Sequence, residues 1–113
     1  MFGIRDEAIE EYPLEGVTRR ILTYNKYIMV MEGHIKKGVK VDHVHPHTQV
    51  TYLVSGEMEG WSGDEHRILH AGDCMVAEPN VRHGVLPLTD VVLIDTFTPC
   101  REDYIPARDL EKK

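Results

Sequence analysis

The sequence predicts an all-β protein, either a sandwich or a barrel, and three observations support this. Short runs rich in β-branched and aromatic residues follow one another along the middle of the chain. Gly, Pro, Asn and Asp separate these runs at close intervals, as turns do in antiparallel sheets. No run of about ten or more residues in the middle has the 3.6-residue period of an amphipathic helix, which disfavours a parallel sheet with crossover helices.

The expected strands lie between the turn signals, and helix is expected only at the ends. The acidic opening MFGIRDEAIEEYP allows two interpretations, a short helix or a disordered arm. The tail REDYIPARDLEKK is expected to be a solvated extension or a short helix. The expected strands are Thr18–Leu22, Tyr27–Ile35, Val39–His45, Gln49–Val54, Glu57–Trp61, His66–Leu69, Cys74–Ala77, His83–Leu86 and Val91–Phe97.

Length and composition limit what the chain can be. A chain of 113 residues is expected to form a single domain, 1–113, with a barrel core over about residues 16–100 and extensions on both sides. The net charge of -6, with basic residues scattered along the chain, disfavours binding to nucleic acid or to an anionic membrane. A bound metal and one or two arginines would still allow an anionic small molecule as a partner.

The sequence contains neither a membrane-spanning run nor a signal-peptide pattern, and it has few cysteines. No apolar run reaches the roughly 20 residues that span a bilayer, and the opening carries acids where a signal peptide needs basic residues. A cytoplasmic location is therefore expected. Cys74 and Cys100 are too few for a disulfide framework, so we expect two buried or half-buried reduced thiols.

A metal site is predicted from the histidines in the middle of the chain. His43 and His45 are two residues apart in an expected strand, so their imidazoles project from the same face. Gln49 begins the next expected strand and offers an amide oxygen, while His83 follows a later turn. Three imidazoles suit Zn, Cu, Fe or Ni, and a neutral amide leaves the ion its full charge to bind an anion or water.

The other histidines are expected to have less specific roles. His47 adjoins the predicted site and is expected to lie behind the ligands or at the surface. His34, His66 and His70 are expected to be ordinary surface or core residues.

One carboxylate in the last expected strand is unusual. The period of two places Asp95 and Phe97 on one face of the strand Val91–Phe97, in the apolar run VVLIDTF. A carboxylate is costly to bury without a partner, so Asp95 is expected either to act in the site or to pair with an arginine. Arg101 follows the turn at Pro99, and a bidentate contact with a carboxylate or a place in the solvated tail are both open to it.

Two further features stay open at the level of the sequence. Phe97 is either a core residue or a platform for a substrate. Arg19 and Arg20 are adjacent in a strand and therefore face opposite ways, but the sequence does not say which of them points inward.

Two segments resemble the motifs of a known superfamily. The segment Gly38–Gly56, GVKVDHVHPHTQVTYLVSG, resembles the first cupin motif, and Gly72–His83, GDCMVAEPNVRH, resembles the second. The resemblance implies the cupin double-stranded β-helix, an antiparallel jelly-roll barrel with one open end for a ligand. The departures are Gln49 for the usual Glu, Asn80 for a usual Gly, Pro87 for a frequent Asn, and a first glycine that comes one residue early.

A narrower resemblance covers most of residues 16–105. The segments GVTRRIL, HVHPHTQVTYLVSG, AGDCMVAEPNVRHGV and VLIDTFTPCREDYI are similar to the small pectin-degradation cupins, which linearise 4,5-unsaturated monouronates. The resemblance implies one divalent transition metal per chain (Ni, Zn, Fe or Mn), active-site residues near the end of the barrel and a homodimer. The implied metal ligands are His43, His45, Gln49 and His83, and the implied active-site residues are Asp95, Phe97 and Arg101.

The expected function is therefore an isomerase-type ring opening of a small anionic sugar acid released from pectin or alginate. Two alternatives stay open, because a fold alone does not define a function. One is a metal-dependent dioxygenase of a small organic substrate. The other is a non-catalytic module that binds a sugar or a metal.

Overall fold

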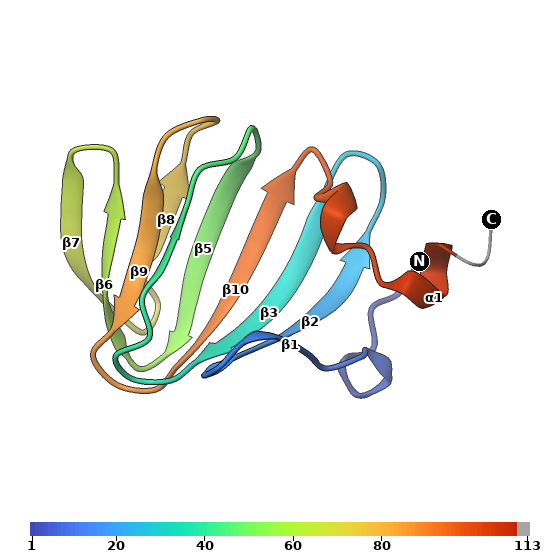
Figure 1. The fold of residues 1–113 in the computed structure, drawn as a ribbon, viewed down its shortest axis with the longest axis horizontal. Coiled ribbons are helices and arrows are strands. Elements are labelled where there is room, and N and C mark those ends of the chain that lie inside the picture. The colour runs from blue at the N-terminus through green and yellow to red at the C-terminus, as the bar shows by residue number, and fades with distance from the viewer. Residues whose placement is uncertain (111–113) are drawn as a thin grey trace.

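The computed structural model describes residues 1–110, whose strands form two antiparallel sheets that face each other (Figure 1). The six-stranded sheet has the order β1-β2-β3-β10-β5-β8, and the four-stranded sheet has the order β4-β9-β6-β7. The expected all-β jelly-roll architecture is confirmed. The strands are β1 (Glu11–Leu14), β2 (Val17–Tyr24), β3 (Met29–Ile35), β4 (Val41–His43), β5 (Thr48–Ser55), β6 (Glu57–Ser62), β7 (Glu65–His70), β8 (Cys74–Ala77), β9 (His83–Pro87) and β10 (Val91–Thr98).

The amino-terminal opening contains the short helix that was one of its two expectations, but only as the 3-10 helix η1 (Arg5–Glu7). The unexpected part is β1, which follows η1 and pairs with β2 at the edge of the six-stranded sheet. The sequence pattern hid this strand because it contains Pro13, which a sheet tolerates on an edge strand.

The strand expected over Val39–His45 is shorter than predicted, and this changes where one predicted ligand lies. β4 ends at His43, so His45 belongs to the loop that leads to β5. The backbone nevertheless keeps the alternation of an extended chain, with Val44 49% exposed and His45 7% exposed. Both imidazoles therefore still turn away from solvent.

The core consists of two apolar clusters, the first between the two sheets and the second between the six-stranded sheet and the carboxyl-terminal segment. In β10 the residues Leu93, Asp95 and Phe97 are all buried, as the period of two predicts. Leu93 belongs to the first cluster and Phe97 to the second, so the Asp95 carboxylate lies between two apolar regions. The first cluster contains Ile35, Leu53, Met58, Leu69, Val85, Val91 and Leu93, and the second contains Ile21, Met29, Met31, Phe97 and Cys100.

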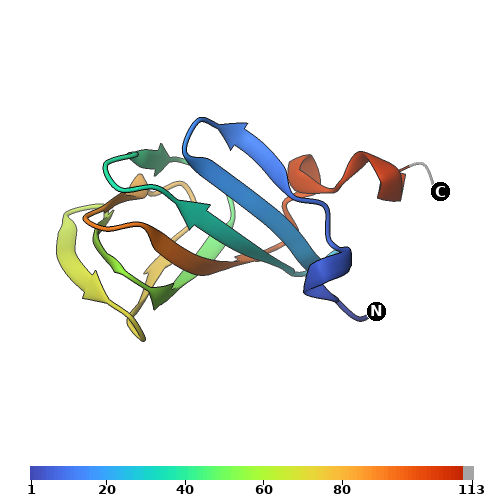
Figure 2. The same cartoon turned by 90° about the horizontal axis from the view of Figure 1, so that it is seen from below.

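The two ends of the described chain lie at the same end of the molecule, beyond the six-stranded sheet (Figure 2). The carboxyl-terminal segment forms a 3-10 turn, η2 (Glu102–Tyr104), and a short helix, α1 (Ala107–Leu110). The hydroxyl of Tyr24 donates a hydrogen bond of 2.8 Å to Asp109, which holds this segment against β2. The short helix expected in the tail is confirmed up to residue 110, and the rest of the expected tail lies outside the described residues.

The conformation of Asn80 and the burial of Cys100 agree with the sequence, whereas the exposure of Cys74 does not. Asn80 has a φ of 63°, so the residue that replaces a usual glycine adopts the left-handed conformation that Asn tolerates. Both cysteines are free thiols, and Cys100 is buried as expected. Cys74 is exposed, contrary to the prediction, because it begins β8 at an edge of the six-stranded sheet.

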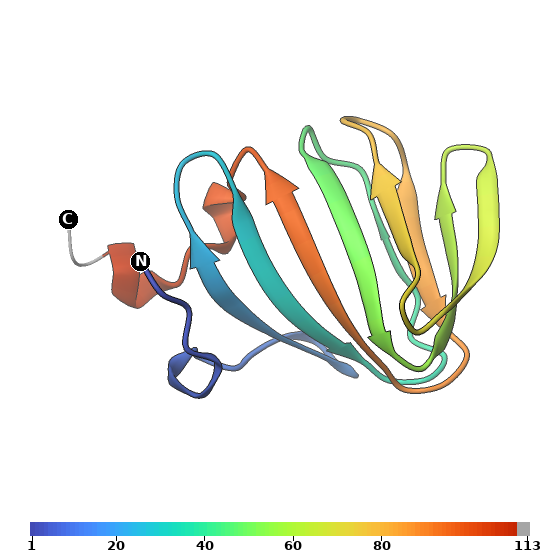
Figure 3. The same ribbon diagram turned by 180° about the vertical axis from the view of Figure 1, so that it is seen from behind.

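The outer face of the six-stranded sheet is apolar at one side. Alternate residues of β5 and a residue of β8 are 40–50% exposed, where an outer face usually carries polar groups. This part of the sheet is seen in Figure 3. It offers an apolar surface for the expected homodimer, which itself stays a prediction. The residues are Val50, Tyr52, Val54 and Val76. Among residues 1–110, no helix is both long and apolar enough to cross a membrane.

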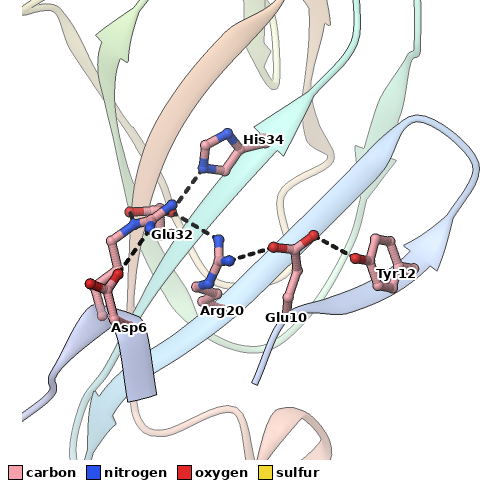
Figure 4. Close-up of polar contacts among 7 residues, drawn as sticks. Asp6, Glu10, Tyr12, Arg20, Glu32 and His34 are labelled. Carbon is pink, nitrogen blue, oxygen red and sulfur yellow. Dashed lines mark hydrogen bonds and ion pairs between the residues drawn. The ribbon is translucent and has the colours of Figure 1, made fainter. Parts of the chain in front are cut away.

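A polar cluster holds the amino-terminal segment to the outer face of β2 and β3 (Figure 4). Its centre is Glu32, 9% exposed, which accepts hydrogen bonds from Arg5 Nε at 2.9 Å and His34 Nε2 at 2.8 Å. Arg20 lies 3.7 Å from the same carboxylate and also pairs with Glu10. The hydrogen bond from Arg5 lowers the pKa of the Glu32 carboxyl below its ordinary value, against the opposing effect of burial.

Replacing this carboxylate should therefore destabilise the protein in a pH-dependent way. We expect Glu32→Gln to lower the free energy of unfolding at pH 7 by about 1–3 kcal/mol, the usual range for hydrogen bonds to a charged group. Because the folded pKa is lowered, the stabilisation is fully present above the unfolded pKa and disappears as the pH falls through the folded pKa. Urea denaturation of the wild type and the variant, at pH 7 and at acidic pH below the folded pKa of Glu32, measures the difference in their free energies of unfolding.

The control for this prediction is Glu59→Gln on the other sheet. The contact of Glu59 with the half-exposed His66 is long, at 4.0 Å, and is therefore expected to be weak. Its effect should stay within about 0.5 kcal/mol, as is usual for surface changes. Equal decreases in the free energy of unfolding of both variants would contradict a special contribution of the Glu32 cluster to stability.

Candidate functional site

The four predicted metal ligands come together between the two sheets. His43 in β4 and His83 in β9 are direct cross-strand partners, with ring centroids 5.8 Å apart. Gln49 comes from β5 in the opposite sheet, and His45 comes from the loop between β4 and β5. All lie at one end of the barrel, where β10 ends and β5 and β9 begin, at the top of Figure 1.

The side-chain amide of Gln49 points its oxygen at two imidazoles. Oε1 lies 2.8 Å from His45 Nε2 and 3.0 Å from His83 Nε2. On its other side, Nε2 donates hydrogen bonds to Asp95 Oδ1 at 3.0 Å and to Thr51 Oγ1 at 3.2 Å. An ionised carboxylate accepts but does not donate, so the NH₂ group must face Asp95 and the oxygen must face the rings.

The protonation of His83 makes this arrangement suited to a cation. Its Nδ1 lies 2.9 Å from the carbonyl oxygen of Val81, which can only accept, so Nδ1 carries the proton. A neutral His83 then directs the lone pair of Nε2 toward the lone pairs of Gln49 Oε1. Two acceptors that face each other in a buried place are satisfied by a shared cation. The donor set therefore fits a divalent transition metal.

The distances between the three histidine rings are unequal. The centroids of His45 and His83 are 4.6 Å apart, whereas His43 lies 6.3 Å from His45. Within residues 1–110, no three His, Cys, Asp or Glu side chains are grouped closely enough to hold an ion as they stand.

The local electrostatics favour neutral imidazoles. Burial, reinforced by the neighbouring His83 and His45, lowers the pKa of His43 to about 4. Burial also lowers the pKa of His45. Neutral rings are the form that binds metals, so these side chains do not need to lose a proton at neutral pH before an ion binds.

Asp95 has two hydrogen-bond donors within the barrel. It lies directly opposite Thr51 in the pairing of β10 with β5, and the Thr51 hydroxyl donates to its Oδ1 at 2.5 Å. Gln49 is the second donor. Burial raises the pKa of Asp95, while the hydrogen bonds from Thr51 and Gln49 oppose that rise. Within residues 1–110 the hydrogen-bond partners of Asp95 are these neutral groups, and no arginine forms an ion pair with it.

Arg101 and Phe97 lie beside the imidazoles. Arg101 is 8% exposed, and its bidentate contact is with Asp103 in its own tail, at 3.0 and 2.8 Å. Its guanidinium also lies 3.9 Å from the centroid of the Tyr104 ring. Phe97 is 2% exposed and lies between the guanidinium, at 5.3 Å, and the His45 ring, at 5.9 Å. Phe97 is thus a core residue that supports both groups.

Comparison with known proteins places this arrangement in a family. Residues 27–97 match the family described as "Cupin domain". The chain is 38% identical over 107 residues to the pectin degradation protein KdgF of Dickeya dadantii, covering 92% of this chain and 97% of that protein. The chain is a cupin of the KdgF family. The resemblance noted in the sequence motifs is confirmed.

Solved structures of related proteins agree with this assignment. The structure of KdgF from Halomonas sp. has 31% identity and a TM-score of 0.87, covering 93% of this cupin and all of that chain. An RmlC-like cupin from Shewanella frigidimarina has 34% identity and a TM-score of 0.87, covering 92% of this chain and 95% of that one.

The structure adds two residues that the sequence analysis missed. Thr51 is on the same face of β5 as Gln49, and the period of two within the predicted strand already indicated this. The Tyr104 ring contacts the guanidinium groups of both Arg101 and Arg19, which lie 3.9 and 4.2 Å from its centroid. No periodic pattern in the tail marked Tyr104.

The open question about the adjacent arginines is resolved, because their partners differ. Arg19 contacts Tyr104 beside the site, whereas Arg20 pairs with Glu10 and Glu32 on the outer face. His47 lies against His45, with ring centroids 5.3 Å apart, and its backbone N–H donates to His45 Nδ1 at 3.3 Å. The remaining histidines pair with outer-face carboxylates, as their ordinary roles predict; they are His34, His66 and His70.

The space next to the ligands is small. A cavity of about 40 Å³ between the sheets is lined by His43, Gln49, Thr51, His83, Asp95 and their apolar neighbours. It is large enough for an ion or a water molecule but far below the roughly 300 Å³ of a small-molecule pocket. A hollow of about 600 Å³ exists on the outer face of the six-stranded sheet, but it contains none of the predicted site residues.

Removing one ligand tests the metal centre directly. We expect about one Ni²⁺ or Zn²⁺ ion to bind each metal-stripped wild-type chain, and His83→Ala to weaken this binding by more than about a hundredfold. Changes in residues that only orient ligands typically cost 10- to 100-fold. Isothermal titration calorimetry measures the affinity. His66→Ala, on the outer face, is the matched control, and equal affinities of the two variants would reject the site.

Proposed function

We propose that this cupin binds one divalent transition metal through His43, His45, Gln49 and His83, and opens the ring of 4,5-unsaturated monouronates. The orientation of the Gln49 amide carries the proposal, because Asp95 and Thr51 direct an oxygen toward two imidazoles. The similarity to a pectin degradation protein supports the choice of substrate.

The proposed reaction is an isomerisation that needs no oxidant or reductant. A proton leaves the anomeric hydroxyl, the bond from the anomeric carbon to the ring oxygen breaks, and the electron pair goes to that oxygen. The anomeric carbon becomes an aldehyde. The enol so formed becomes a ketone when a proton is added at the neighbouring carbon of the former double bond. Protons lost and gained balance.

Asp95 is the group that we assign to proton transfer. When bound, the metal supplies Lewis acidity toward the negative charge that develops on the substrate oxygen. Both hydrogen bonds to Asp95 reach Oδ1. The other carboxylate oxygen, Oδ2, is therefore the atom assigned to accept the hydroxyl proton and return one to carbon.

Arg101 is assigned to the substrate carboxylate. Its hydrogen bonds to Asp103 use Nε and Nη2, so the Nη1 edge of the same planar group is left to meet an anion. Stacking on Tyr104 and packing against Phe97 limit the rotation of the guanidinium. This rigidity favours a fixed position for the sugar acid at the open end of the barrel.

The first activity test replaces the proposed base. Metal-loaded wild-type protein should accelerate the loss of the conjugated double bond of a 4,5-unsaturated uronate, and Asp95→Asn should lower kcat by about 10²- to 10⁴-fold. The amide of the variant can still accept from Thr51 and Gln49, so metal binding should persist. Ultraviolet absorbance follows the double bond. A wild-type rate equal to the spontaneous rate would reject ring opening.

The two alternatives predict different outcomes in the same assay. A non-catalytic binding module should retain sugar affinity in Asp95→Asn and produce no change in product. A dioxygenase should consume oxygen when iron-loaded protein meets catechols or thiols.

Replacing the proposed anchor should act mainly on substrate binding. We expect Arg101→Lys to raise KM by about tenfold or more, because an ammonium does not reproduce the planar contacts of a guanidinium. Steady-state kinetics separate KM from kcat. The control is Arg82→Lys, whose side chain is 65% exposed and pairs with Asp42. An unchanged KM in Arg101→Lys would contradict the assigned role.

A further inference from the structure

We propose that Thr51 is a positioning residue that holds the Gln49 amide with its oxygen toward the imidazoles. The inference deepens the proposed function and rests on its metal-binding part, not on the identity of the sugar. Thr51 lines the same small cavity as Gln49, but in residues 1–110 its hydroxyl makes no hydrogen bond to an imidazole. Its partners are Gln49 and Asp95, and Gln49 is the one of the two that faces the rings.

The register of two strands places the three groups in contact. Thr51 in β5 is the direct partner of Asp95 in β10, and Gln49 lies two residues earlier on the same face of β5. All three side chains are buried, with exposures of 4% for Thr51 and 7% for the other two. Without competition from bulk water, their hydrogen bonds determine one another's orientation.

The Thr51 hydroxyl has a defined direction in this network. It donates to Asp95 Oδ1 at 2.5 Å, because the carboxylate can only accept when ionised. Its lone pairs therefore face Gln49, whose Nε2 lies 3.2 Å away. The amide meets two acceptors on that side, Asp95 and Thr51, and must present its NH₂ group to both.

The opposite orientation of the amide would gain one hydrogen bond and lose another at the end that faces the imidazoles. If the amide rotated by half a turn, NH₂ would donate to the bare Nε2 of His83, which now faces Oε1 at 3.0 Å, but the contact of Oε1 with His45 Nε2 at 2.8 Å would be lost. The amide oxygen would then point away from the imidazoles, and Gln49 would not be able to act as a metal ligand. Thr51 and Asp95 together oppose this rotation, which would set the amide oxygen against two other oxygens.

Removing only the hydroxyl tests the inference. Thr51→Val keeps the shape of the side chain, and Thr51→Ser keeps the hydroxyl. We expect Thr51→Val to weaken Co²⁺ binding to the metal-stripped full chain by about 10- to 100-fold, the range typical for groups that orient metal ligands. Thr51→Ser should bind within about threefold of wild type. Calorimetry gives the affinity, and the visible absorption of bound Co²⁺ should change in Thr51→Val alone, because its ligand field changes.

The controls separate a positioning role from a packing role. Thr96→Val, on the half-exposed outer face of β10, should leave affinity and spectrum unchanged. Thr51→Ala, measured in the same way, serves if Thr51→Val does not fold, which thermal unfolding reveals. Wild-type affinity and spectrum in the variant that lacks the hydroxyl would overturn the inference, as would equal losses in Thr51→Ser and Thr51→Val. Failure of the wild type to bind Co²⁺ would instead overturn the proposed metal centre.

Discussion

The burial of one carboxylate constrains the rest of the site. Asp95 lies in the barrel between two apolar clusters, and burial raises its pKa. An ionised carboxylate in such a place needs donors, and the register of β10 with β5 supplies Thr51 and Gln49. The same hydrogen bonds that satisfy the carboxylate determine which end of the Gln49 amide faces the histidines. The hydrogen bonds that satisfy the buried carboxylate therefore also arrange the candidate site.

The two sheets contribute different parts of the site. The four-stranded sheet supplies His43 and His83 as cross-strand partners, and the six-stranded sheet supplies Gln49 and Asp95. Only packing of the two sheets face to face brings imidazoles and amide together, so the site depends on the core being formed. The loop that carries His45 joins the sheets directly, from β4 to β5.

Much of this could be predicted from the sequence, because alternation along a strand is a local property. The inward direction of Asp95 and Phe97 and the paired projection of His43 and His45 follow from a period of two. The hydrogen-bond partners of Asp95 could not be predicted, because Thr51 is 44 residues away and the register between their strands is a property of the whole sheet. The identity of the Arg101 partner could not be predicted either. A bidentate contact with a carboxylate was one of the two expectations, and Asp103 provides it from a short turn that has no periodic signal.

The presence of glutamine at position 49, where the general cupin motif has a glutamate, follows from the same constraint. Gln49 Nε2 donates to Asp95 Oδ1 at a distance of 3.0 Å. A glutamate would place two carboxylates in contact in a buried region, and their repulsion would force one of them to hold a proton. A glutamine offers the imidazoles a neutral oxygen and offers Asp95 a donor. In this chain the glutamine and the aspartate are therefore complementary, because each supplies what the other requires.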